Sequence, residues 1–282
     1  MQVQRQPRIC VLQEPSGAAR RRARAVACGV TFTSDDARAA LDHLAIHGWA
    51  RLGVLADADR LAALRARTDA IMDTGAPELG LFFQHDSATG AYADLDFGAG
   101  WTGPSRAYRK IEGLERDPVF RAWIEAPCFA TLTASAIAGP VAVSRAVLWT
   151  KATSGGTELP WHQDGGKFWG LSAQPTLTVW TALDDAPVES GCVEVLPGTH
   201  TGGLATPEGG TIPEALTADA RPLQLPAVAG EVLLLHNLVW HRSRRNRTAH
   251  PRRALSVCLM SAAIRCTRTR RAPRQFARLF DR

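Results

Sequence analysis

The segment Leu159-Pro-Trp-His-Gln-Asp-Gly165 contains the only His-x-Asp sequence among the eight histidines of this chain. Residues i and i+2 of a β-strand project from the same face, so a strand through this segment places His162 and Asp164 side by side. One imidazole and one carboxylate on a shared face are two of the three ligands of a 2-His-1-carboxylate facial triad. Such a triad leaves coordination positions open, as non-haem iron(II) oxygenases require. A lone His-x-Asp is a weak signal, and a third ligand is needed.

Four later histidines are candidates for that ligand: His200, His236, His241 and His250. His241 is favoured because Arg252 follows it by eleven residues, at the start of the apolar run Ala254–Met260. A metal in such a triad chelates the keto-acid end of 2-oxoglutarate, and a buried guanidinium can bind its distal carboxylate through two parallel hydrogen bonds. His200, at the end of a Pro-Gly turn, is interpreted as a structural residue, and His236 as a core residue or a residue that contacts the metal ligands.

The sequence around this segment predicts helices first and strands later. Helices are expected from Ser34 as N-cap to about Ala45, from Asp57 to about Asp73, from Asp117-Pro118, and from Pro127 to about Ala138, with a short strand at Ala50–Val54. Runs rich in β-branched and aromatic residues then alternate with Gly/Pro turns, at Val141–Trp149, Trp161–Asp164, Leu177–Leu183, Cys192–Leu196, Glu231–His236, Leu238–His241 and Ala254–Met260. The pattern predicts an α+β fold, mainly β, in which N-terminal helices support a barrel or jelly roll.

One domain is expected over residues 33–282, with helical support at 33–140, a barrel core at 141–262 and a basic tail at 263–282. Residues 1–32 show no clean periodicity and are interpreted as a flexible basic arm. The Gly-rich stretch Ser87–Ser105 is interpreted as a long loop that closes over the site as a lid, because long loops in compact domains are often functional.

The amino-acid composition limits the classes of protein to which this chain can belong. No apolar stretch is long enough for a membrane span, and the six cysteines form no C-x-x-C pair, so a cytoplasmic protein with reduced thiols is expected. The net charge is +6, with only three lysines among 33 basic residues. The basic tail has one aromatic residue and no nucleic-acid motif, so a solvated charged surface is favoured over nucleic-acid binding.

Here the chain resembles the phytanoyl-CoA dioxygenase family of iron(II)/2-oxoglutarate oxygenases. The resemblance extends from about Tyr108 to Ala262, and the residues that carry it are Arg109-Lys-Ile-Glu-Gly-Leu-Glu-Arg-Asp117, Pro160-Trp-His-Gln-Asp-Gly165, Val179-Trp-Thr-Ala-Leu183, Glu189-Ser-Gly-Cys192, Leu196-Pro-Gly-Thr-His200, Gly230-Glu-Val-Leu-Leu-Leu-His236 and the pair His241 and Arg252. It implies a double-stranded β-helix, a cupin-like jelly roll with helical support. The combined pattern is specific for the family and indicates no particular substrate.

The resemblance also implies roles for individual residues. His162, Asp164 and His241 match the iron ligands, and Arg252 matches the arginine that binds 2-oxoglutarate. Lys110 and Trp180 match further co-substrate contacts, although a surface position for Lys110 and a core position for Trp180 stay open. Arg253 is expected to point away from Arg252 into solvent. The candidate substrate contacts are Trp101, His85, Trp149 and Phe168.

These residues imply an enzyme that uses Fe(II), 2-oxoglutarate and O2, with ascorbate as a supporting reductant, and that releases succinate and CO2. Hydroxylation of a small molecule is the expected reaction, with desaturation, epoxidation and ring closure as alternatives. Halogenation is disfavoured because the carboxylate ligand Asp164 is present. A natural-product intermediate is the favoured substrate and an acyl-CoA the alternative. A non-catalytic metal-binding jelly roll or a nucleic-acid-associated protein is the competing interpretation. A monomer or a homodimer is expected.

Overall fold

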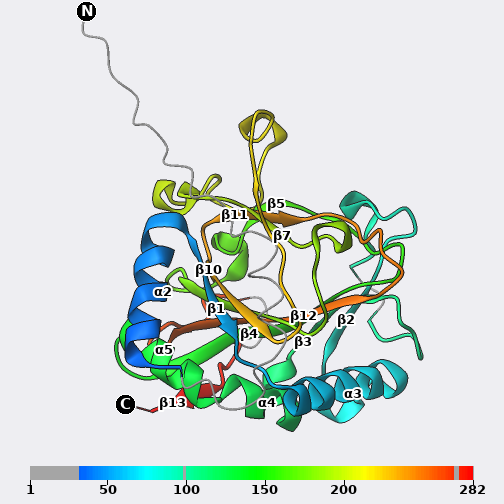
Figure 1. The fold of residues 1–282 in the computed structure, drawn as a ribbon, viewed down its shortest axis with the longest axis horizontal. Coiled ribbons are helices and arrows are strands. Elements are labelled where there is room, and N and C mark those ends of the chain that lie inside the picture. The colour runs from blue at the N-terminus through cyan, green and yellow to red at the C-terminus, as the bar shows by residue number, and fades with distance from the viewer. Residues whose placement is uncertain (1–31, 98–99, 270–272, 282) are drawn as a thin grey trace, which may run out of the picture. The chain divides into compact units, whose positions relative to one another are not determined.

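The computed structural model describes residues 32–97, 100–269 and 273–281, which belong to one compact unit that runs from Thr31 to Arg282. The arm predicted over residues 1–32 lies outside the described residues, apart from Phe32. Two antiparallel β-sheets form the centre of this unit, and four α-helices of the described residues pack beside them (Figure 1). No helix in the described ranges is long and apolar enough to cross a membrane.

The larger sheet has the strand order β1-β10-β6-β12-β4-β3-β2, and β13 also pairs with β4. Its strands are β1 (Trp49–Val54), β2 (Phe82–His85), β3 (Tyr108–Glu112), β4 (Val141–Lys151), β6 (Leu177–Ala182), β10 (Glu231–His236), β12 (Arg252–Ser261) and β13 (Arg278–Phe280). The smaller sheet has the order β8-β5-β11-β7-β9, with β5 (Leu159–Gln163), β7 (Val193–Leu196), β8 (Gly210–Thr211), β9 (Leu223–Leu225) and β11 (Trp240–Ser243). This arrangement is a double-stranded β-helix, and the predicted fold class is confirmed.

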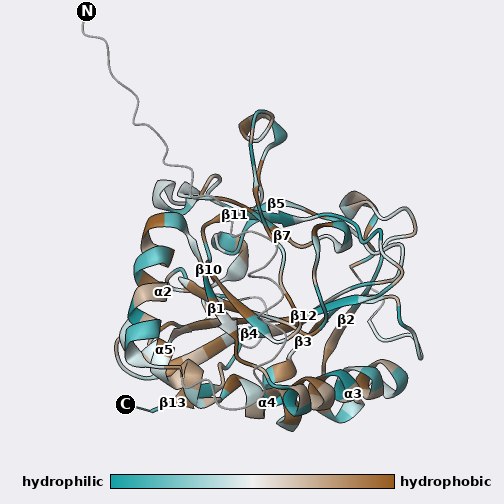
Figure 2. Ribbon diagram, in the orientation of Figure 1, coloured by the Kyte–Doolittle hydropathy of each residue, from teal (hydrophilic) through white to brown (hydrophobic). Residues whose placement is uncertain are grey.

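Strand β10 shows how the larger sheet separates two hydrophobic cores. Val232 and Leu234 belong to the core that the sheet shares with the helices, whereas Leu233 and Leu235 belong to the core between the two sheets. Successive residues of a strand face opposite sides, so a strand that is covered on both sides is apolar at every position. The central strands of the larger sheet are accordingly hydrophobic along much of their length (Figure 2).

Helix α2 (Ser34–His47) begins one residue earlier than predicted, because its N-cap is Thr33 and not Ser34. The Thr33 hydroxyl accepts a hydrogen bond from the Asp36 amide at 3.2 Å, and the Asp36 carboxylate accepts one from the Thr33 amide at 2.8 Å. This reciprocal pair is a capping box. The helix ends at Gly48, which has φ 79°, and the predicted stop is confirmed.

The other three helices begin where their caps and prolines predict. They are α3 (Ala58–Thr74), α4 (Pro118–Ile124) and α5 (Pro127–Ala136). Asp57 caps α3 and Asp117 caps α4 through their carboxylates. These helices lie on the outer face of the larger sheet, and the inner face packs into the core between the sheets (Figure 1).

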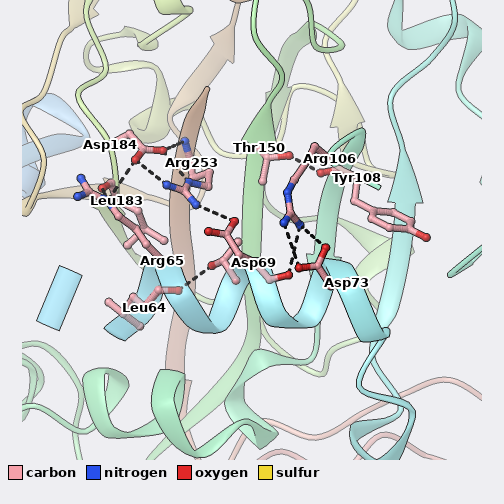
Figure 3. Close-up of polar contacts among 11 residues, drawn as sticks. Leu64, Arg65, Asp69, Asp73, Arg106, Tyr108, Thr150, Leu183, Asp184 and Arg253 are labelled. Atoms are coloured by element: carbon pink, nitrogen blue, oxygen red, sulfur yellow. Dashed lines mark hydrogen bonds and ion pairs between the residues drawn. The ribbon is translucent and has the colours of Figure 1, made fainter. Parts of the chain in front are cut away.

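Arg253 fixes helix α3 to strand β12 (Figure 3). Its Nε donates to Asp184 at 2.8 Å and a terminal nitrogen donates to Asp69 of α3 at 3.2 Å. Arg253 does point to the opposite face from Arg252, but helix α3 covers that face, and the Arg253 side chain is only 15% exposed. The expectation of a solvated Arg253 is therefore wrong.

The sequence did not predict β2, β3, β8, β9 or β13, which are all five residues or shorter. The predicted loop over residues 87–105 lies between β2 and β3 and contains a short 3-10 helix at Tyr92–Asp94. The tail was expected to be a solvated surface, yet β13 pairs with β4 and the Arg274 side chain donates to the Trp169 carbonyl at 2.7 Å. The described part of the tail is thus partly packed against the barrel, while other tail residues such as Arg265 are exposed as expected.

Candidate metal centre

The three predicted ligands lie together, two of them on strands of the smaller sheet and Asp164 in the bend after β5. His162 of β5 and His241 of β11 are directly paired across the two strands, and their ring centroids are 4.0 Å apart. Nε2 of His241 lies 3.7 Å from a carboxylate oxygen of Asp164. Within the described residues, these three form the one cluster of His, Cys, Asp or Glu able to hold a metal ion, with all ligand atoms within 4.8 Å of one another.

Backbone contacts orient both imidazoles. Nδ1 of His162 lies 2.9 Å from the Pro160 carbonyl, and Nδ1 of His241 lies 2.9 Å from the Val239 carbonyl. A carbonyl only accepts, so Nδ1 of each ring donates to it, and Nε2 is the nitrogen that can bind a metal. This is how second hydrogen bonds normally orient metal-binding histidines. Each ring therefore offers Nε2 as its free donor atom.

Two further features suit a divalent cation. Burial is the main cause that lowers the pKa of His162 to about 4, with a further contribution from His241. The imidazole is therefore neutral at physiological pH, the state in which it binds metal. Asp164 is held at its backbone, because its amide donates to the Asn237 carbonyl at 2.7 Å and its carbonyl accepts from the Asn237 side chain at 3.1 Å. The donor set of two imidazoles and one carboxylate fits iron(II).

Arg252 lies in the same cavity as the triad and is only 2% exposed. One terminal nitrogen donates to the Gly191 carbonyl at 3.1 Å, while Nε has no hydrogen-bond partner. Burial lowers the pKa of Arg252 to about 10, so the group stays charged at neutral pH. A buried guanidinium with an unpaired N–H is unfavourable unless a ligand accepts from it. The arrangement fits the distal carboxylate of a dicarboxylic acid such as 2-oxoglutarate.

Two of the predicted aromatic residues also line this cavity. The Trp180 ring centroid lies 6.0 Å from the Arg252 guanidinium carbon, and Trp149 lines the cavity from β4. Trp180 is 4% exposed, so its contacts with the core and its position at the cavity are both observed. Its contact with a co-substrate, like a substrate contact of Trp149, stays a prediction.

The sequence did not point to two further buried cations of this cavity, Arg109 and Lys151. Arg109 donates to the Gln84 side chain at 2.6 Å, and its Nε has no partner. Lys151 donates to the Thr157 carbonyl at 2.8 Å, and burial lowers its pKa well below the ordinary value. Arg109 lies at a shift in strand register between β2 and β3, which pair Gln84 with Lys110. Such a bulge changes the direction of a side chain, and the sequence shows no sign of it.

Lys110 and Phe168 lie at a second cavity and do not line the triad cavity. The Lys110 ammonium is paired with Glu112 at 2.7 Å. Phe168 follows the Asp164 loop and is 52% exposed. The predicted co-substrate contact of Lys110 and the substrate contact of Phe168 therefore find no support in the triad cavity and stay predictions.

His85 and Trp101 are likewise absent from the lining of the triad cavity. Nε2 of His85 lies 2.9 Å from the Thr102 hydroxyl. Trp101 packs on Gly75 at the end of α3, so closely that a Cβ at Gly75 would stand 2.6 Å from the indole. Substrate contacts of these two residues stay predictions.

The remaining candidate histidines are not at the metal centre. His200 is buried, its Nε2 lies 3.1 Å from the Ala45 carbonyl, and its ring lies 4.8 Å from that of His236. Nδ1 of His236 accepts from the Leu238 amide at 3.1 Å. His200 and His236 thus have the structural positions that were predicted for them, and His250 is exposed.

Fold and site together define a double-stranded β-helix protein with a 2-His-1-carboxylate cluster between its sheets. The sequence model of the family described as phytanoyl-CoA dioxygenase (PhyH) matches residues 46–254. The chain therefore belongs to the phytanoyl-CoA dioxygenase family, and the predicted resemblance is confirmed.

Among relatives, phytanoyl-CoA dioxygenase domain-containing protein 1 of Mus musculus is 32% identical over 174 residues, which are 57% of this chain and 60% of that protein. The chain thus matches little more than half the length of such curated relatives. EctD from S. alaskensis, solved with 2-oxoglutarate and 5-hydroxyectoine, has a TM-score of 0.67 and 19% identity, covering 89% of this chain and 88% of that one. The epimerase SnoN, in complex with Fe3+, alpha ketoglutarate and nogalamycin RO, has a TM-score of 0.64 and 19% identity, covering 84% and 88%.

Proposed function

We propose that this protein is an iron(II)- and 2-oxoglutarate-dependent oxygenase that hydroxylates a small molecule and releases succinate and CO2. The observation that carries the proposal is a single cavity that contains both a facial triad and Arg252, a buried guanidinium with an unpaired Nε. Family membership supports the same class of activity.

The side chains of the cavity have separate tasks in this proposal. His162, Asp164 and His241 would hold the iron, with both Nε2 atoms directed to it. Arg252 would bind the distal carboxylate of 2-oxoglutarate, and Trp180 would pack beside that guanidinium. Iron held by these three residues would supply the activation of dioxygen that oxidative decarboxylation of 2-oxoglutarate requires. The buried walls of the cavity exclude water, which strengthens the ion pair and limits side reactions.

The favoured substrate is a secondary metabolite or another free small molecule. Two structural neighbours support this choice, since their descriptions name nogalamycin RO and 5-hydroxyectoine as bound compounds. An acyl-CoA thioester is the alternative, supported by the name of the family and by the basic residues of the second cavity.

The test is the formation of succinate from 2-oxoglutarate by the full-length protein, measured by mass spectrometry with and without Fe(II). Candidate metabolites and acyl-CoA thioesters are then screened for products that have gained one oxygen atom. We expect iron-dependent succinate formation in the wild type and none in His162→Ala. If iron binds stoichiometrically and no succinate forms with any candidate, the chain is a metal-binding protein and the proposal is wrong.

A further inference from the structure

The second cavity is formed by β3, β4, the turn after Asp164 and the packed part of the tail. It has a volume of about 440 Å³, against about 60 Å³ for the triad cavity. The smaller cavity offers little room beyond a metal and a compact co-substrate. The second cavity therefore has room for a larger molecule, which the triad cavity does not offer.

The two cavities are neighbours. Trp149 lines the triad cavity, and its ring centroid lies 5.6 Å from the Lys110 ammonium, which lines the second. The Asn237 side chain donates both to the Asp164 carbonyl and to Cys258, at 3.1 and 3.2 Å. Cys258 is the strand partner of Arg145, which lines the second cavity. Lining residues of the two cavities are thus in contact through Trp149 and Lys110, and Asn237 and Cys258 connect Asp164 with the strand partner of Arg145.

The lining of the second cavity has an excess of positive charge. Its cationic residues are Lys110, Arg116, Arg145, Arg268 and Arg274, and its carboxylates are Glu112 and Glu115. Glu112 is shared, because Lys110 approaches it at 2.7 Å and Arg145 at 3.1 Å. Burial alone would raise the pKa of Glu112, but Arg145 and Lys110 lower it to about 2, so this carboxylate is fully ionised and already paired. Burial, followed by repulsion from Arg145, lowers the pKa of Lys110 to about 8.

Several hydrogen-bond donors in this lining have no acceptor. Nε1 of Trp169 and Nε of Arg274 are buried and unpaired, as is the hydroxyl of Ser144. Trp169 is 4% and Ser144 6% exposed. An indole N–H and a guanidinium N–H can only donate, so each is a donor without an acceptor in this structure. The Arg145 guanidinium carbon also lies 5.1 Å from the Trp169 ring centroid, so these two residues of the lining are in contact.

We propose that the second cavity binds the primary substrate and that this substrate carries an anionic oxygen group, a carboxylate or a phosphate, held by Arg145, Arg274 and the indole N–H of Trp169. This inference rests on the proposed function, and it assigns a substrate class to an enzyme of that type. The exposed ring of Phe168 offers an apolar surface at the rim for the rest of the molecule.

The test uses three probes of similar shape: 3-phenylpropionate, phenyl phosphate and the neutral 3-phenylpropionamide. Binding to the full-length protein is measured by calorimetry with Mn(II) and saturating 2-oxoglutarate, so that no turnover occurs. We expect an anionic probe to bind about tenfold or more tightly than the amide, because a charge-assisted hydrogen bond contributes roughly that factor. The preferred anion shows whether a carboxylate or a phosphate is recognised.

Variants that remove a positive charge and a variant that removes a negative charge should change anion binding in opposite directions, which identifies the site. Arg145→Gln and Arg274→Gln should each weaken the anionic probe about tenfold. Glu112→Gln should strengthen it, because the variant frees two cations, and this gain cannot come from misfolding. Arg265→Gln, an exposed residue outside the cavity lining, changes the net charge equally and should leave binding unchanged.

The outcomes separate this inference from the proposed function. The inference is wrong if the amide and the anionic probes have equal dissociation constants. It is also wrong if none of the three cavity variants changes the dissociation constant of the anionic probe. A probe that competes with 2-oxoglutarate likewise overturns the inference, because the anion site is then the co-substrate site. Absence of iron-dependent succinate formation would instead overturn the proposed function, whatever the probes show.

Discussion

Replacing Arg252 with lysine keeps the positive charge and removes the planar guanidinium with its parallel N–H donors. Arg252 is 2% exposed and already donates one terminal N–H to the Gly191 carbonyl, which leaves Nε and the remaining N–H groups of the guanidinium for a carboxylate. The lysine ammonium provides a point charge in place of two parallel donors. The loss of one charge-assisted hydrogen bond costs about 1.5–3 kcal/mol. The dissociation constant of 2-oxoglutarate should therefore rise about 10- to 150-fold.

The assay is anaerobic titration of the iron-loaded protein with 2-oxoglutarate, followed by calorimetry. Arg253→Lys is the matched control, because Arg253 is the next residue and points to the opposite face, where it pairs with Asp184 and Asp69. The control should lower the free energy of unfolding by about 1.5 kcal/mol and leave 2-oxoglutarate affinity unchanged. If both variants weaken 2-oxoglutarate equally, or if neither does, Arg252 is not the carboxylate ligand.

Three further results are expected. His241→Ala and Asp164→Ala should each lose stoichiometric iron, measured by elemental analysis, while their melting temperatures stay close to that of the wild type; retained iron would show that the ligand set is wrong. Asp164→Gly should open a ligand position for chloride, whereas a chlorinated product from the wild type, detected by mass spectrometry, would contradict the proposed chemistry. His236 has a pKa lowered to about 4, chiefly by burial and then by His200, so its unfolded form binds the proton more readily. The contribution of neutral His236 to the free energy of unfolding is present above pH about 6.5 and is lost as the pH falls towards 4, by at most about 3 kcal/mol. In denaturant titrations, the free energy of unfolding of His236→Gln should therefore fall less steeply between pH 6.5 and pH 4 than that of the wild type.

The parts that the sequence predicted well depend on local periodicity. The continuous apolar run of β10 and the i, i+2 spacing of His162 and Asp164 are properties of a few consecutive residues, so they indicate a buried strand and a shared face directly. Gly48 and Gly75 likewise end helices through their own backbone conformation, at φ 79° and 74°. These features need no knowledge of distant segments.

The parts that were missed depend on partners that are far away in the chain. Arg253 was assigned to solvent because its face alternates with that of Arg252, yet Asp69 of α3 covers that face. The expected cap of α2 was wrong by one residue, because Thr33 and Ser34 are chemically similar and only the reciprocal contact with Asp36 distinguishes them. Arg109 reaches the triad cavity through a shift in register that only strand pairing reveals.

The C-terminal tail shows why an arginine-rich segment cannot be assigned from composition alone. Arg268 and Arg274 donate to the carbonyls of Phe168 and Trp169, at 2.7 Å in each case. These two residues belong to the turn that follows Asp164, one of the three candidate metal ligands. The tail thus holds the wall of the second cavity in place and also contributes cations to it. A basic tail that binds nucleic acid would need its guanidinium groups free in solvent, whereas these two guanidinium groups are bound to the barrel. Their contacts connect the charge excess of the sequence with the cavity beside the metal centre.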